Sequence, residues 1–216
     1  MYKQQIMPNR FIHLTTFLLL LAASRSPMLA QAQRFKAGFA FGLNGSQIQG
    51  DDVGGYNRLG LQGGLRAVTV LKEKSELVLE MLYSQRGSYS KYGSPKCPNG
   101  DISIGLQYVE VPVTYCYKDW YQEEEGYYRL QACGGLSYSR LIAAKALGSC
   151  HDDLVEKFNQ NDIGIVLGVE YFTSPRFLFG ARWSRSLTLL YDKDKHDPGR
   201  NSLWGYFLSF RGVYMF

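Results

Sequence analysis

The chain has 216 residues, of which 45% are hydrophobic and 20% are charged, and its formal net charge is +5 at pH 7. Its mean hydropathy of −0.21 is slightly polar. After the first 32 residues, no uninterrupted apolar run approaches the length of a membrane helix. These features exclude a membrane protein built from spanning helices. No linker or shift in composition divides the chain, so we expect a single domain.

The first 32 residues have the three parts of a secretory signal peptide. A basic start precedes an apolar run over residues 14–23, and a small-x-small motif follows at residues 30–32. The apolar run is too short to span a bilayer as a helix. We therefore expect an exported protein that is cleaved after Ala32, with a barrel domain comprising residues 33–216.

Loss of the signal segment changes the charge of the protein. It removes three of the 24 Lys and Arg residues and none of the 19 Asp and Glu residues, which leaves 21 basic against 19 acidic side chains. The mature domain therefore has a formal net charge of +2. A balance this close to neutral does not indicate a nucleic acid partner, so we expect none.

Beyond the signal segment, apolar and polar residues alternate with a period of two in eight runs of about ten residues. This dyad repeat is typical of a transmembrane strand with one face in lipid and the other in a lumen. In chain order the runs cover residues 35–43, 59–71, 77–86, 108–117, 129–138, 162–171, 177–187 and 202–216. We therefore predict eight strands, and the Tyr and Trp residues near their ends predict aromatic girdles at the membrane interfaces.

The connections between these runs alternate between long and short. The long connections cover residues 45–57, 87–101, 141–161 and 190–202. The short connections are centred on residues 72–74, 122–126 and 173–175. Outer-membrane barrels have an even number of strands, short periplasmic turns and long outer loops. The sequence therefore predicts an all-β fold, an eight-stranded antiparallel up-and-down transmembrane β-barrel in the cell outer membrane, with both chain termini periplasmic.

The last run ends the chain on an aromatic residue. It places Trp204, Phe210, Tyr214 and Phe216 on one face, and Arg211 on the other. A terminal strand that ends on an outward Phe is how bacterial outer-membrane barrels close. We expect Phe210, Tyr214 and Phe216 to face the outer-membrane lipid and to form the insertion signal for the barrel assembly machinery.

The polar faces of the runs carry charges of both signs. An unpaired charge in an apolar medium is costly, so these side chains are expected to pair inside the lumen. The expected lumen charge network comprises Arg66, Glu80, Arg86, Glu110, Arg129, Glu170, Arg182 and Arg211. Eight strands leave an interior just wide enough for side chains or one small ligand. We favour a packed ionic interior over a functional relay, and expect no bulk solute passage.

The four cysteines all follow the signal segment, and an even number in an oxidising compartment favours disulfides. Cys97 and Cys150 lie in two long loops on the same side of the predicted barrel, which allows a disulfide between them. Cys116 and Cys133 point inward on neighbouring strands, and they face each other if the hairpin turns tightly at residues 124–125. Paired strand residues are close enough for a disulfide.

The sequence offers little for catalysis or metal binding. The two histidines of the mature domain, His151 and His196, lie in long loops beside carboxylates, where such neighbours are mostly solvated side chains. A general base needs an orienting carboxylate and a proton within hydrogen-bond reach. Residues 192–199 resemble a calcium-binding loop only loosely, because a lysine replaces the third ligand. We therefore predict that the protein is no enzyme and uses no metal or cofactor.

Several segments are similar to those of a known family. They are residues 36–47 (KAGFAFGLNGSQ), 76–88 (ELVLEMLYSQRGS), 106–117 (LQYVEVPVTYCY), 129–139 (RLQACGGLSYS), 162–171 (DIGIVLGVEY) and 181–184 (ARWS). Together they resemble the PorT-like outer-membrane β-barrel family of Bacteroidetes, over residues 34–216, and the most specific part is the segment from Tyr108 to Pro112. The resemblance implies an eight-stranded barrel. It does not settle the activity: some members are linked to the type IX secretion machinery, and most have no assigned role.

The leading hypothesis is a noncatalytic outer-membrane barrel whose long outer loops contact a partner protein, lipid or surface polymer. Outward Arg140 and Arg185 near the outer rim are candidates for contact with lipid phosphates. One alternative is an accessory of the type IX secretion machinery, with envelope or secretion proteins as partners. The others are a narrow small-solute pore and an outer-membrane lipid-modifying enzyme or protease.

Overall fold

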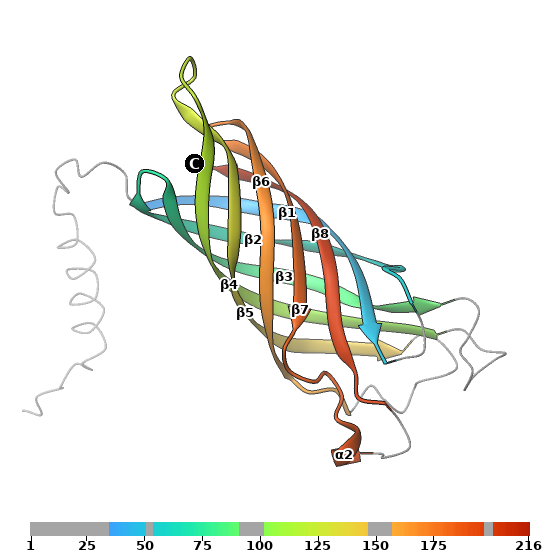
Figure 1. The fold of residues 1–216 in the computed structure, drawn as a ribbon. Helices are drawn as coiled ribbons and strands as arrows, with labels where there is room; N and C mark the ends of the chain where they lie inside the picture. Colours follow the sequence, from blue (N-terminus) through green and yellow to red (C-terminus); the bar gives the residue numbers. More distant parts are fainter. Residues whose placement is uncertain (1–34, 51–53, 91–101, 147–156, 197–200) are drawn as a thin grey trace, which may run out of the picture. The chain divides into compact units, whose positions relative to one another are not determined.

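The computed structural model describes residues 35–50, 54–90, 102–146, 157–196 and 201–216. Antiparallel strands form a closed barrel in the order β1 to β8 (Figure 1). They are β1 (Phe35–Gln49), β2 (Arg58–Lys72), β3 (Ser75–Ser90), β4 (Ile102–Gln122), β5 (Tyr127–Ala146), β6 (Asn161–Ser174), β7 (Phe177–Ser186) and β8 (Trp204–Met215). A short helix, α2 (Lys193–His196), lies between β7 and β8. The predicted eight-stranded all-β barrel is confirmed.

Pairing of the first and last strands closes the barrel. The β1–β8 ladder runs from Gly38↔Met215 to Gln49↔Trp204, and every other ladder joins strands that are adjacent in sequence. Connections of two to four residues lie at one end of the barrel, which we call the short-turn end. Longer connections lie at the opposite, long-loop end. Among the described residues, no helix is long and apolar enough to cross a membrane.

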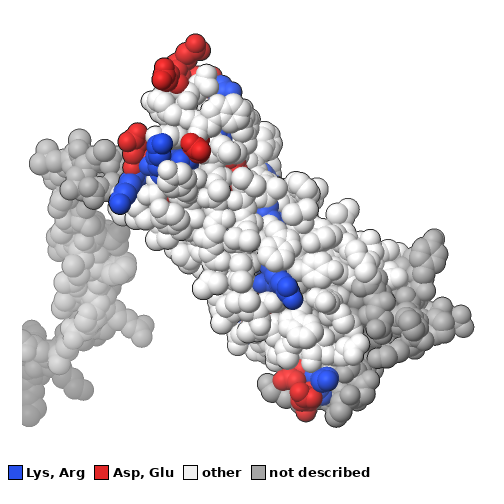
Figure 2. Space-filling view, in the orientation of Figure 1, with Lys and Arg blue, Asp and Glu red and all other residues white. Residues whose placement is uncertain are grey.

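The alternation of side chains gives the barrel wall an apolar outer face. Leu59 is 76% exposed and Phe210 is 62% exposed, and exposed aliphatic or aromatic side chains occur on all eight strands. Exposed apolar surface of this extent indicates contact with lipid, not with water. Figure 2 shows the same pattern on one face, where charged side chains gather at the two ends and the surface between them is mostly uncharged.

Two apolar clusters fill the lumen near its two ends. The cluster at the long-loop end contains Ile48, Ile104, Leu106, Tyr108, Phe158, Leu190, Tyr191 and Leu203. The cluster toward the short-turn end contains Ala40, Val68, Val78, Leu82, Cys116, Cys133, Leu178, Val213 and Met215. Phe158 and Leu190 come from connections between strands, where the N–H of Asn159 donates to the carbonyl of Leu190 at 2.8 Å. Parts of two long connections thus fold into the mouth of the barrel instead of extending away from it.

Candidate functional site

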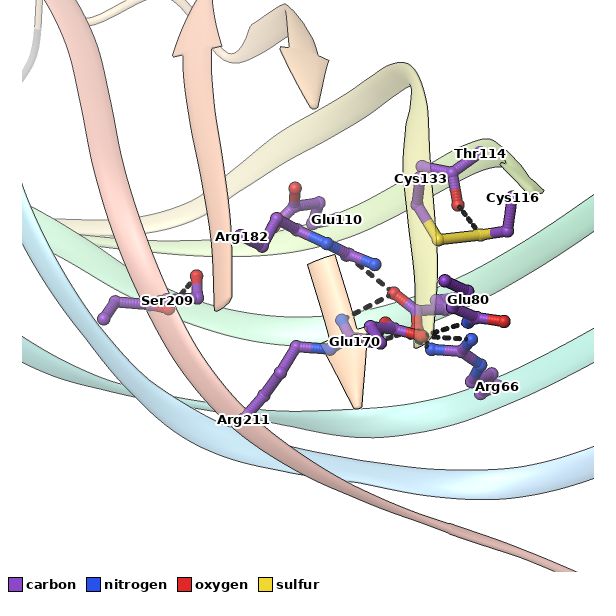
Figure 3. A network of polar contacts seen from close by, with 12 residues as sticks. Arg66, Glu80, Glu110, Thr114, Cys116, Cys133, Glu170, Arg182, Ser209 and Arg211 are labelled. Atoms are coloured by element: carbon purple, nitrogen blue, oxygen red, sulfur yellow. Dashed lines mark hydrogen bonds and ion pairs between the residues drawn. A yellow bond between two sulfur atoms is a disulfide. The ribbon is translucent and has the colours of Figure 1, made fainter. Parts of the chain in front are cut away.

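Charged side chains cross the lumen in a layer that we call the central layer (Figure 3). It comprises Arg66 on β2, Glu80 on β3, Glu170 on β6, Arg182 on β7 and Arg211 on β8. Each of these residues is at most 4% exposed. All five were expected in the lumen because each occupies one of the alternate positions that form the polar face of its strand.

Every carboxylate of the central layer is bound by more than one guanidinium group. Glu80 accepts hydrogen bonds from Arg66 at 3.2 Å, Arg182 at 2.7 Å and Arg211 at 3.0 Å. Glu170 accepts two from Arg66, at 2.8 and 2.7 Å, and one from Arg211 at 3.1 Å. The two-bond contact has the bidentate geometry that favours arginine over lysine. With three guanidinium groups and two carboxylates, the central layer carries a formal charge of +1.

A second group of charges, the outer layer, lies nearer the long-loop end. Arg86 donates to the carboxylate of Glu110 and lies 3.7 Å from Asp162. The guanidinium also lies 5.0 Å from the ring centre of Tyr108 and 4.0 Å from that of Phe207. These ring contacts stabilise a largely buried cation. One guanidinium and two carboxylates give this layer a formal charge of −1, which balances the surplus of the central layer.

The charge layers lie between the two apolar clusters. Val68 and Val213 follow Arg66 and Arg211 by two residues, and both belong to the cluster toward the short-turn end. Tyr108, on the other side, precedes Glu110 by two residues and belongs to the cluster at the long-loop end. Ion pairs enclosed in this way are weakly screened, so removal of one partner leaves the other uncompensated.

Arg129 was predicted to join the lumen network, and this prediction is wrong. Its guanidinium donates to the Tyr171 hydroxyl at 3.3 Å and to Glu125 at 2.9 Å, and its side chain is 27% exposed. The residue lies near the β4–β5 turn, opposite Trp120, whose φ of 59° interrupts the regular ladder. Because the barrel wall ends there, Arg129 reaches solvent and partners at the rim and does not enter the lumen.

Other lumen charges were missing from the predicted network. Asp162 belongs to the outer layer, and it has the same parity on β6 as Glu170, so the alternation alone could have identified it. Lys118 on β4 donates to Glu76 on β3 near the short-turn end. Recognition of that pair required the β3–β4 register, which places Lys118 beyond the last paired residues.

The predicted strand cysteines lie at the same level of the barrel. Cys116 and Cys133 are directly paired on β4 and β5, with a Cα–Cα distance of 4.1 Å, and form a disulfide that faces the lumen. Cys97 and Cys150 lie outside the described residues, as does His151. The backbone of His196 ends α2. The described part of the chain contains no group of three His, Cys, Asp or Glu residues suited to a metal ion.

The residues of the expected insertion signal lie on the outer wall. Phe210, Tyr214 and Phe216 are exposed, and the ring of Phe216 meets that of Phe39 edge to face at 5.2 Å. The N–H of Phe216 donates to the carbonyl of Ala37 at 2.8 Å. The last residue is therefore held against β1 with its ring facing outward.

Residues 28–192 match the family model described as outer membrane protein beta-barrel domain, and this match covers more than half of the chain. The chain belongs to this family. The protein is thus an outer-membrane β-barrel, in agreement with the apolar outer wall and the closed antiparallel sheet.

Several solved outer-membrane barrels are similar to this chain at low sequence identity. Ail, the attachment invasion locus protein of Yersinia pestis, is 12% identical over 84% of this chain and 98% of that chain, with a TM-score of 0.47. Neisserial surface protein A is 16% identical over 84% and 96%, with a TM-score of 0.43. OprG from Pseudomonas aeruginosa is 12% identical over 84% and 94%, with a TM-score of 0.40. No curated protein matches the sequence.

Proposed function

We propose that this outer-membrane barrel is a noncatalytic scaffold with a closed lumen, and that its long-loop end contacts a partner protein, lipid or surface polymer. The observation that supports the proposal is the packing of the lumen. Buried side chains of the central layer connect β2 and β3 with β6, β7 and β8 across the interior. Apolar clusters lie beyond the charge layers toward both ends. An interior filled in this way offers no continuous path to solutes.

The proposal includes a direction of insertion. We propose that residues 1–32 are a cleaved signal peptide and that the short-turn end, with both ends of the barrel chain, faces the periplasm. The alternation of short and long connections supports this direction, because outer-membrane barrels place short turns on the periplasmic side. Phe210, Tyr214 and Phe216 would then be presented to the assembly machinery from the periplasm.

Conductance measurements test the closed lumen. Vesicles that contain the purified full-length barrel are fused with planar bilayers. The heat-modified band of the same vesicle preparation on gels reports whether the barrel is folded. We expect no stepwise conductance at any voltage that the bilayer tolerates. Regular steps from folded wild-type protein would support the narrow-pore alternative instead. The noncatalytic part is contradicted if His151→Ala or His196→Ala abolishes an envelope phenotype that depends on the protein.

A second candidate function is an accessory role in type IX secretion. The segment from Tyr108 to Pro112, which lies on β4, resembles the PorT-like barrels of Bacteroidetes and supports this candidate. The test is a deletion strain with quantitative analysis of periplasmic, surface and secreted proteins. Cargo proteins retained in the periplasm would support the accessory role. An unchanged secreted proteome would remove it and leave the scaffold proposal in place.

A further inference from the structure

A pocket opens on the outer wall at the long-loop end, where β2 and β3 separate. Their ladder ends toward this side at Gln62↔Ser84. Beyond it, the Ser46 hydroxyl joins the two strands, because it accepts the N–H of Gly87 at 2.8 Å and donates to the carbonyl of Arg58 at 3.2 Å. The separation leaves space on the outer surface of the wall between β2 and β5. The residues around it are Arg58, Leu59, Gln85, Gly105, Gln107 and Lys145, together with the buried Leu106 and Arg86, which is paired with Glu110 in the outer layer.

Two cations border the floor of this pocket at Gly105. The guanidinium of Arg58 donates to the Ser103 hydroxyl at 2.8 Å, and a Cβ added to Gly105 would lie 2.7 Å from Nη2 of Arg58. Lys145 is the ladder partner of Gly105 on β5 and is exposed. The missing side chain at Gly105 thus provides the room in which the guanidinium lies.

The pocket differs from the lumen in its balance of charge. No carboxylate lines it, and within the described parts of the chain neither Arg58 nor Lys145 forms an ion pair. Outward Arg140, by contrast, already donates to the side-chain oxygens of Asn161 and Gln160, at 2.7 Å each. Two cations without a counterion, next to amide side chains, form a site suited to a phosphate group.

The pocket lies where the outer wall changes from apolar to polar. Outward positions on β4 are tyrosines and valines from Tyr117 to Val109 and become polar at Gln107. Val109 is paired with Tyr83 on β3, and a tyrosine at the end of an apolar stretch marks the interface of a membrane. Leu59, which is 76% exposed, lies beside the cations. A ligand here would therefore have its anionic group at the pocket and apolar chains along the wall.

We propose that this pocket binds the phosphate group of an outer-membrane lipid, with Arg58 and Lys145 as the two binding cations. The site specifies where the lipid contact of the proposed function is made, and the proposal rests on the outer-membrane location of the barrel. Arg58 and Lys145 belong neither to the charge layers of the lumen nor to the long connections, so their test is separate from the conductance test. The neighbouring apolar wall favours a lipid over free phosphate, because free phosphate gains nothing from apolar contact.

The test uses full-length barrel in neutral detergent, titrated with phosphatidic acid and followed by native mass spectrometry. Phosphatidylcholine with the same acyl chains and inorganic phosphate serve as the comparison ligands. We expect one saturable site for phosphatidic acid, weakened about tenfold in the double variant Arg58→Gln, Lys145→Gln. The matched control, Lys72→Gln with Lys193→Gln, removes the same charge from exposed positions elsewhere and should bind like the wild type.

A second variant keeps both charges. Gly105→Ala would displace the guanidinium of Arg58, the flexible end of a side chain, so the barrel should fold and give a normal heat-modifiable band while binding weakens. Equal binding by the double variant and the control would overturn the proposal. Binding of inorganic phosphate as tight as that of phosphatidic acid would overturn the lipid assignment. Displacement of the lipid by a sulfated oligosaccharide at lower concentration would assign the site to a surface polymer instead.

Discussion

Replacement of Glu80 by glutamine would remove a negative charge that three guanidinium groups share. Arg66, Arg182 and Arg211 all donate to this carboxylate, and all are buried. The formal charge of the central layer would rise from +1 to +2, with Glu170 as the remaining carboxylate. Loss of one partner from a buried ion pair costs about 3–5 kcal/mol. We expect Glu80→Gln to lower the free energy of unfolding by an amount in this range.

Arg182→Met provides the matched comparison. Arg182 makes one hydrogen bond to Glu80, and its loss brings the formal charge of the central layer from +1 to 0. We expect a cost of about 1–2 kcal/mol, because one charge-assisted bond is lost while repulsion among the guanidinium groups decreases. The two substitutions remove charges from the same buried layer and differ in sign and in the number of contacts.

The assay is urea unfolding of the barrel in lipid vesicles, followed by tryptophan fluorescence. Glu123→Gln, in the exposed β4–β5 turn, is the control and should leave the midpoint unchanged. A cost for Arg182→Met equal to or greater than that for Glu80→Gln would refute the reasoning. It would mean that the surplus cation of the central layer is required, and that the layer is stabilised by its total positive charge instead of by shared carboxylates.

Three further predictions concern the disulfide, the last residue and one glycine. Cys116→Ala with Cys133→Ala removes a disulfide between residues 17 positions apart and should lower the free energy of unfolding by about 3 kcal/mol. An unchanged urea midpoint would contradict this. Deletion of Phe216 should reduce the heat-modifiable barrel in outer membranes, and wild-type levels would remove its role in insertion. Gly87→Ala should reduce the folded yield, because the Cβ would lie 1.9 Å from a β4 backbone oxygen, whereas Gly54→Ala has open space and serves as control.

The period-two alternation was sufficient to predict the strands, their order and the face of almost every side chain. It failed at the ends of strands. The run 108–117 predicted only the middle of β4, which extends over Ile102–Gln122. The ladder continues beyond the apolar stretch, where outward side chains such as Gln107 are polar and the apolar signal stops. The same effect shortened the prediction for β5, so Lys145 was assigned to a loop and its pocket was missed.

Partners across the lumen could not be predicted from the alternation. Parity placed Arg66 and Glu170 in the lumen, but their contact joins positions 104 residues apart. Which inward residues meet depends on the stagger of all strands around the closed barrel. The cysteine pair was different, because a tight hairpin fixes the register of its two strands. The apolar cluster at the long-loop end was also missed, because Phe158 and Leu190 lie in connections with no repeating pattern.

The lumen charges favour one register of β8 against β1 when the barrel closes. Arg211 on β8 lies opposite Gly42 on β1, and a Cβ at Gly42 would come within 2.9 Å of the Arg211 backbone. If β8 slipped by one residue, Arg211 would turn toward lipid and either Phe210 or Gly212 would enter the lumen. Glu80 and Glu170 would each lose a cation at the same moment. Correct and shifted registers are thus separated by a large energy gap, so a misaligned seam would be unable to persist in the finished barrel.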